Sequence, residues 1–132
     1  MAISPWNFPL AILCGMAGAA GAGGNTVLLK PSNNPPVIAA EPVCLCIGAG
    51  FPPGVFNLVT GRGSEAGERL IASPRIDAVA FTGLMEVSLL IWKTAGRTPP
   101  SQPNLNQIIC EMVGLDQCPA SVGSQGLPIR LS

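Results

Sequence analysis

Short apolar runs alternate along the chain with segments of glycine, proline and polar residues. The runs predict strands at residues 2–4, 26–29, 55–59, 76–81 and 107–112. The second run, TVLL, is apolar at nearly every position, which is typical of a strand covered on both faces of its sheet. Glycine, proline or small polar residues follow each run, so each predicted strand ends in a turn.

Helical segments are predicted between these strands, at residues 10–22, 37–47, 64–72 and 86–95. Gly18 and Gly21 weaken the first by about 1 kcal/mol each relative to alanine, and Pro42 is unfavourable inside the second. Ser64 is positioned to cap the third. Because strands and helices alternate, the sequence predicts an α/β fold with a mainly parallel sheet and flanking helices. In such sheets, ligands bind beyond the carboxyl ends of the strands.

The composition is unusually poor in charge. Charged residues make up 11% of the 132 residues, with seven basic and seven acidic side chains, against ~25% charge in a typical soluble domain. A neutral chain without a basic cluster is not expected to bind nucleic acid. Without histidine, the chain cannot form a Ser-His-Asp triad or a histidine metal site by itself. We expect an interior piece of a larger protein, because a free-standing domain exposes more charge.

No charged side chain precedes Lys30, which raises the alternatives of a membrane span or a signal peptide. No basic segment opens the chain, Pro5 and Pro9 interrupt its start, and residues 15–25 are mostly glycine and alanine. A buried globular helix is therefore preferred, with no membrane contact. The five cysteines fit small buried residues in a reducing compartment better than disulfides or a zinc site. The expected location is the cytoplasm, or the mitochondrial matrix in a eukaryote.

Candidate chemistry lies in the turns after the strands. Asn7 has an amide that can donate to an oxyanion, and Trp6 can wall a pocket, although without further evidence an Asx turn with a packed tryptophan is the preferred alternative. Lys30 ends a buried strand, where it needs an anionic or polyhydroxyl partner unless it reaches solvent. Glu111 interrupts an apolar strand, so we expect it to be buried, either with a raised pKa suited to a general base or as a structural carboxylate.

Glycines mark two further turns. Gly63 and Gly67 belong to a Gly-x-Gly-x-x-x-Gly pattern at the start of a predicted helix, where glycine lets a ligand or phosphate approach closely. The pattern departs from Gly-x-Gly-x-x-Gly, and it also fits an ordinary strand-to-helix turn. Gly83 lies in a similar turn after the fourth strand. No metal site is expected in any of these turns.

Five sequence strings are more specific together than any turn alone. ISPWNFPLAI, GNTVLLKPS, FPPGVFNLVTGRGSEAG, AFTG with a following EV, and ICEM occur in this order. They resemble the aldehyde dehydrogenase superfamily over residues 1–116, whereas residues 117–132 have no likeness to it. The opening string, GRGSE and EM are most similar to the 1-pyrroline-5-carboxylate (glutamate semialdehyde) dehydrogenase branch. The resemblance implies a Rossmann-like cofactor-binding domain that is incomplete.

The resemblance also implies a reaction, in which a cysteine thiolate attacks an aldehyde and hydride passes to NAD or NADP. For this branch the substrate is glutamate semialdehyde and the product is glutamate. Asn7 matches the oxyanion-stabilising amide, and Glu111 matches the general base. The positions that match cofactor contacts are Trp6 near the phosphates, Lys30, Ser32 and Asn33 at the ribose, Gly63 and Gly67 beside the adenine, and Gly83 in the next turn. The implied partners are a small aldehyde and further copies of the chain.

Several residues depart from the family pattern. Asn33 stands where the family has glutamate, Leu84 where it has serine, and Ser88 where it has glycine. Asn33 also removes an acidic group that would repel the 2′-phosphate of NADP. No cysteine in the family's Gly-Gln context follows Glu111, and Cys110 is expected to be a packing residue.

We therefore expect a piece of a dehydrogenase that is inactive alone, binds the cofactor weakly or not at all, and associates through exposed apolar surface. Three alternatives remain open: a non-catalytic product of a truncated or frameshifted gene, another aldehyde dehydrogenase subfamily, and a small binding module.

Overall fold

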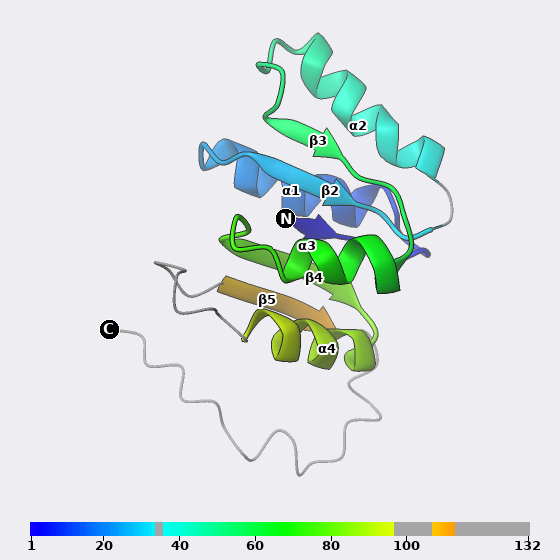
Figure 1. Cartoon of the computed structure of the whole chain (residues 1–132). Helices are drawn as coiled ribbons and strands as arrows, with labels where there is room; N and C mark the ends of the chain where they lie inside the picture. The colour runs from blue at the N-terminus through cyan, green and yellow to red at the C-terminus, as the bar shows by residue number, and fades with distance from the viewer. Residues whose placement is uncertain (34–35, 97–106, 113–132) are drawn as a thin grey trace.

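The computed structural model describes residues 1–33, 36–96 and 107–112. Strands and helices alternate along these ranges, as the sequence predicts (Figure 1). The strands are β1 (Ala2–Ile3), β2 (Val27–Lys30), β3 (Phe56–Leu58), β4 (Ala78–Gly83) and β5 (Gln107–Met112). The helices are α1 (Ala11–Ala22), α2 (Pro36–Gly48), a π-helical turn η1 (Gly63–Gly67), α3 (Glu68–Ile71) and α4 (Met85–Ala95).

The five strands form one sheet in the order β3-β2-β1-β4-β5, and every neighbouring pair is parallel. The chain starts in the middle of the sheet, moves outward to β3, and then crosses back to build β4 and β5 (Figure 1). This reversal of direction beside β1 is the topological switch point of a doubly wound α/β fold. The α/β prediction with a parallel sheet is therefore confirmed.

Helices cover both faces of the sheet because side chains alternate along each strand. On one face, Leu13 and Ala17 of α1 pack with Val27 and Leu29 of β2. On the opposite face, α3 and α4 bury a second cluster, composed of Ile3, Ile71, Ile76, Val79, Phe81, Ile91 and Ala95. Two separate cores therefore hold the sheet, one on each side, and the β1 residues Ala2 and Ile3 contribute to one each.

The structure shifts several predicted element boundaries, and two of these shifts affect the turns that carry candidate residues. Ser64 does not cap a helix, because Arg62 precedes the first turn and no side chain caps it. The turn itself is π-helical, and the α-helix begins only at Glu68. Strand β4 continues through Thr82 and Gly83, which were predicted as a turn, because both residues stay paired with β5.

Pro42 lies inside α2 despite its poor helix propensity. Its side chain is buried and lines the space between α1 and α2, so its burial offsets the lost hydrogen bond. Within residues 1–33, 36–96 and 107–112, no helix is both long and apolar enough to cross a bilayer.

Candidate functional site

The residues that the sequence singles out end neighbouring strands on one edge of the sheet. Ile3 of β1 lies beside Lys30 of β2, and Thr82 of β4 lies beside Glu111 of β5. Parallel strands bring all their carboxyl ends to the same edge. The turns that contain the candidate residues therefore gather at this edge, as predicted.

A cavity of about 220 Å³ opens at this edge, between the sheet and helices α3 and α4. It brings together three predicted cofactor-binding residues, Lys30, Gly63 and Gly67, and Glu68 also lines it. Its apolar wall is formed by Ile3, Ile71, Val87, Leu90 and Ile91. We call it the Lys30 cavity.

Lys30 is the most unusual residue of this cavity. Its side chain points to the α3–α4 face, as does that of Leu28 two residues earlier, and only 3% of its surface is exposed. The Nζ atom donates to the Pro31 carbonyl oxygen at 2.9 Å. Burial lowers the pKa of the Lys30 ammonium, and no charged group in the described ranges offsets this. The structure thus favours burial over the alternative that Lys30 reaches solvent.

Two glycines shape the turn that faces Lys30. Gly67 is buried, and a Cβ atom at this position would lie 3.6 Å from Lys30 Cε, so its absence leaves room beside the amine. Gly61 adopts φ +141°, which few residues other than glycine tolerate. A Cβ at Gly61 would also lie 2.9 Å from the Ala66 Cβ. Gly61 therefore sets the path of the chain into η1, a role that the sequence prediction did not assign.

The apolar wall was missed by the sequence analysis. Gly63, Gly67 and Ile71 recur at intervals of four residues, and so do Val87 and Ile91. On a helix, such positions share one face. This spacing could have been used to predict that α3 and α4 both present an apolar face toward Lys30.

The other predicted cofactor residues lie outside the Lys30 cavity. Trp6 is 74% exposed, and Asn33 is also exposed. Ser32 is half-buried. Gly83 is buried at the end of β4, where a Cβ atom would lie 2.6 Å from the Phe81 ring. The structure thus gathers three of the seven predicted cofactor-binding residues around one cavity.

Glu111 is exposed, so the prediction that it is buried is wrong. It pairs with Thr82, whose hydroxyl donates to the Met16 sulfur of α1 at 4.0 Å. Glu111 therefore lies on the α1 face of the sheet. No described helix covers β5 on this side, because α4 packs on the opposite face. Asn7, in the turn after β1, is exposed as well.

Cys110 points to the other side of β5 and packs against the core beneath α4. Burial raises the pKa of its thiol, and the neighbouring Ser88 hydroxyl offsets part of this rise. Adjacent strand residues face opposite sides of a sheet, so Cys110 and Glu111 cannot act on one substrate atom. This agrees with the prediction that Cys110 is a packing residue.

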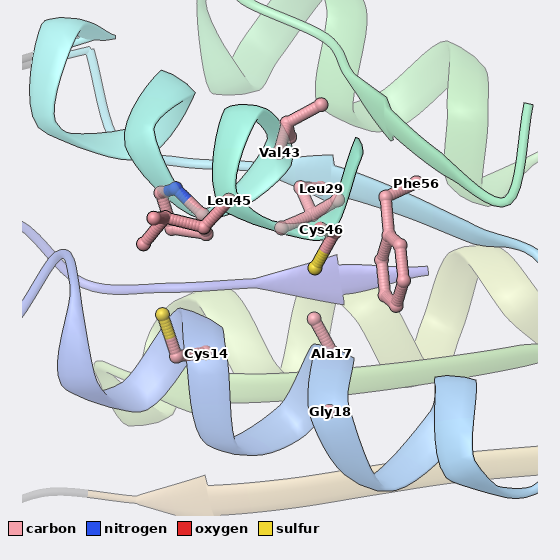
Figure 2. Close-up of a pocket in the computed structure, with 9 residues that line it drawn as sticks. Cys14, Ala17, Gly18, Leu29, Val43, Leu45, Cys46 and Phe56 are labelled. Carbon is pink, nitrogen blue, oxygen red and sulfur yellow. The ribbon is translucent and has the colours of Figure 1, made fainter. Parts of the chain in front are cut away.

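A second cavity, of about 190 Å³, lies between α1 and α2 and contains none of the predicted residues (Figure 2). Cys14 and Cys46 direct their sulfur atoms toward it from the two helices. Cys14 and Cys44 are exposed, and Cys46 and Cys110 are only partly buried, so the prediction that most cysteines are buried is wrong for the four that the structure describes. In the part of the chain that the structure describes, no group of three or more acidic or cysteine side chains could hold a metal ion.

Comparison with known proteins adds a family to this geometry. The model of the aldehyde dehydrogenase family matches residues 1–118. A 1-pyrroline-5-carboxylate dehydrogenase of Bacillus mycoides is 48% identical over 114 residues, which are 86% of this chain and 22% of that protein. The chain therefore spans about a fifth of the length of this curated relative.

Solved structures agree with this match. A 1-pyrroline-5-carboxylate dehydrogenase from Thermus with bound NAD superposes with a TM-score of 0.82 at 43% identity, over 86% of this chain and 22% of that one. Proline utilization A from Bdellovibrio bacteriovorus gives a TM-score of 0.82 at 42% identity, over 86% of this chain and 12% of that one. Sequence and topology thus agree, and the chain belongs to the aldehyde dehydrogenase family.

Proposed function

We propose that this chain forms the cofactor-binding sheet of an NAD(P)-dependent dehydrogenase that oxidises glutamate semialdehyde to glutamate. The single observation that supports it most is the Lys30 cavity, where a buried amine and two glycines meet at the strand ends. The relatives named as 1-pyrroline-5-carboxylate dehydrogenases support the substrate, and the Thermus structure with bound NAD supports the cofactor.

The residues of the Lys30 cavity fit the adenosine half of such a cofactor. Among the residues that the structure describes, no carboxylate pairs with the buried Lys30 ammonium, and ribose hydroxyls are acceptors that would satisfy its remaining N–H groups. The apolar wall of Ile3, Ile71 and Val87 suits a flat aromatic base. Gly67 leaves space beside the amine. When bound, the cofactor supplies the acceptor for a hydride.

Other residues would bind the cofactor outside this cavity. Ser32 and Asn33 follow Lys30 and would contact the ribose, Trp6 would lie near the phosphates, and Gly83 would leave space at the start of α4. Asn33 carries no charge that would repel a 2′-phosphate, but no basic residue closely follows it to bind one, so the cofactor would be NAD or NADP. Leu84, which is 67% exposed at the start of α4, offers no hydroxyl to a phosphate, and this weakens binding.

Asn7 and Glu111 would carry out the chemistry at the aldehyde. Both side chains are exposed at the carboxyl ends of their strands. The Asn7 amide would donate to the oxygen on which negative charge develops. The Glu111 carboxylate would take the proton of the attacking thiol or water.

The chain alone is expected to lack turnover, because no cysteine follows Glu111 in the Gly-Gln context in which the family carries its nucleophile. Cys110 lies on the face opposite Glu111, and Cys14, Cys44 and Cys46 precede Glu111 on α1 and α2. Purified chain should therefore produce no NADH from glutamate semialdehyde and NAD+. Robust aldehyde-dependent NADH formation would contradict the assignment of these cysteines.

A sharper test uses the two halves of the cofactor. If the Lys30 cavity holds adenosine, AMP should bind the full chain as NAD+ does, whereas nicotinamide mononucleotide should not. Ligand-observed NMR can compare the three at equal concentration. Equal binding of both mononucleotides would contradict the proposed cavity, and binding of none would favour the alternative of a non-catalytic gene product.

A further inference from the structure

The amine of Lys30 is placed in surroundings that disfavour its charge. Its side chain is 3% exposed, and its Nζ atom donates to one backbone carbonyl at 2.9 Å. Glu68 lines the same cavity but does not offset the effect of burial on Lys30. The remaining wall is mostly aliphatic. A buried ammonium without an ion-pair partner is costly, so the uncharged amine is favoured relative to a lysine in water.

An uncharged amine is a nucleophile, and lysines in apolar pockets react with carbonyl compounds for this reason. Lys30 also has space for a reaction partner, because it lines a cavity of about 220 Å³. Gly67 contributes to this space, since it leaves open the position 3.6 Å from Lys30 Cε.

We propose that Lys30 is a covalent modification site that condenses reversibly with small aliphatic aldehydes to form an imine. In this step the Lys30 nitrogen forms a bond to the aldehyde carbon and gives a carbinolamine. The carbinolamine then loses its oxygen as water, and the proton of the original ammonium passes to solvent. No electrons are exchanged. The neutral imine removes the buried charge, and the alkyl group packs against Ile71, Val87 and Ile91.

Aldehydes in this site would occupy the space that the proposed function assigns to adenosine. The condensation itself does not depend on cofactor binding, and it is measured without cofactor. A chain that fails to bind NAD+ would therefore leave the test of Lys30 intact.

The chain offers an internal control because Lys30 and Lys93 are its two lysines. Lys93 is exposed on α4. The folded full chain is incubated with butanal and cyanoborohydride at neutral pH, and peptide mass mapping measures alkylation at each lysine. We expect alkylation of Lys30 to be faster than that of Lys93 by about tenfold. Equal rates, or a faster reaction at Lys93, would overturn the proposal.

Two further experiments distinguish an effect of the cavity on the reactivity of Lys30 from an effect of its neighbours in the sequence. One unfolds the chain, and the other compares a matched pair of variants. In urea the preference for Lys30 should vanish, and a preference that persists there would contradict a role of the cavity. Gly67→Ala places a methyl group against Lys30 and should slow the reaction several-fold. Gly15→Ala on α1, where a Cβ atom meets nothing within 4 Å, should leave it unchanged. Equal effects of the two substitutions would also count against the proposal.

Discussion

At the scale of single residues, the two charged side chains that the sequence singled out in apolar strands have different surroundings in the structure. Lys30 was identified from its position at the end of an apolar strand, and it is buried at the cavity. Glu111 was identified in the same way, yet it is exposed. The reason is that burial depends on which helix covers each face, and α4 covers only the Cys110 side of β5. A run of apolar residues in the sequence does not show which face of its strand a helix will cover.

The charge of Lys30 leads to a prediction about stability and pH. Its pKa is lowered in the folded state, so the unfolded chain binds more protons between the folded and the unfolded pKa, and stability rises with pH across that interval. Lys30→Met removes a buried charge and should stabilise the fold at pH 7 by roughly 1 kcal/mol. This gain in the free energy of unfolding should shrink as the pH approaches 10.5, the ordinary pKa of lysine.

Urea denaturation of both chains at neutral and alkaline pH measures this difference. The comparison isolates Lys30, because every other titrating group is common to the two chains. A variant that is less stable at pH 7, or a difference that does not change with pH, would show that the buried ammonium is not a destabilising group.

At the scale of elements, alternation of apolar and turn segments was enough to predict each strand that the structure describes and the helices between them. Boundaries were less predictable. The β4 strand extends to Gly83 because Thr82 and Gly83 pair with β5, which is a long-range interaction absent from local sequence. The π-helical turn at Gly63–Gly67 was also unforeseen. It depends on the path of the chain at Gly61, where φ is +141°. Glycine can adopt this φ but can equally adopt others, so the presence of a glycine does not predict the turn.

Helix α1 depends on few side chains for its attachment to the sheet. Its fully buried side chains are Leu13 and Ala17, because glycine and alanine make up most of the rest of the helix. Leu13→Ala should therefore lower the free energy of unfolding by about 2–5 kcal/mol.

Leu45→Ala on α2 is a suitable control for this prediction. Leu45 is 71% exposed, so its replacement should change stability by less than about 0.5 kcal/mol. Thermal or urea denaturation followed by circular dichroism measures both changes. Similar losses for the two variants would mean that α1 is not held by its Leu13 contact.

At the scale of the whole molecule, low charge and exposed apolar side chains have a common consequence. Large apolar side chains are exposed on several elements, among them Val37 on α2, Leu89 on α4 and Ile109 on β5. Exposed apolar patches favour association, and a strand edge such as that of β5 can pair with another chain. We predict that the chain alone associates or precipitates. A monomer in light scattering, with one sharp thermal transition, would contradict this prediction.

The central claim is that this member of the aldehyde dehydrogenase family binds NAD through the Lys30 cavity. Calorimetric titration of NAD+ into the full chain and into Lys30→Ala tests it most directly. The account predicts weak binding, with a Kd of about 1 mM or somewhat higher, that is lost in the variant. No heat at millimolar NAD+, or equal binding by both chains, would contradict it.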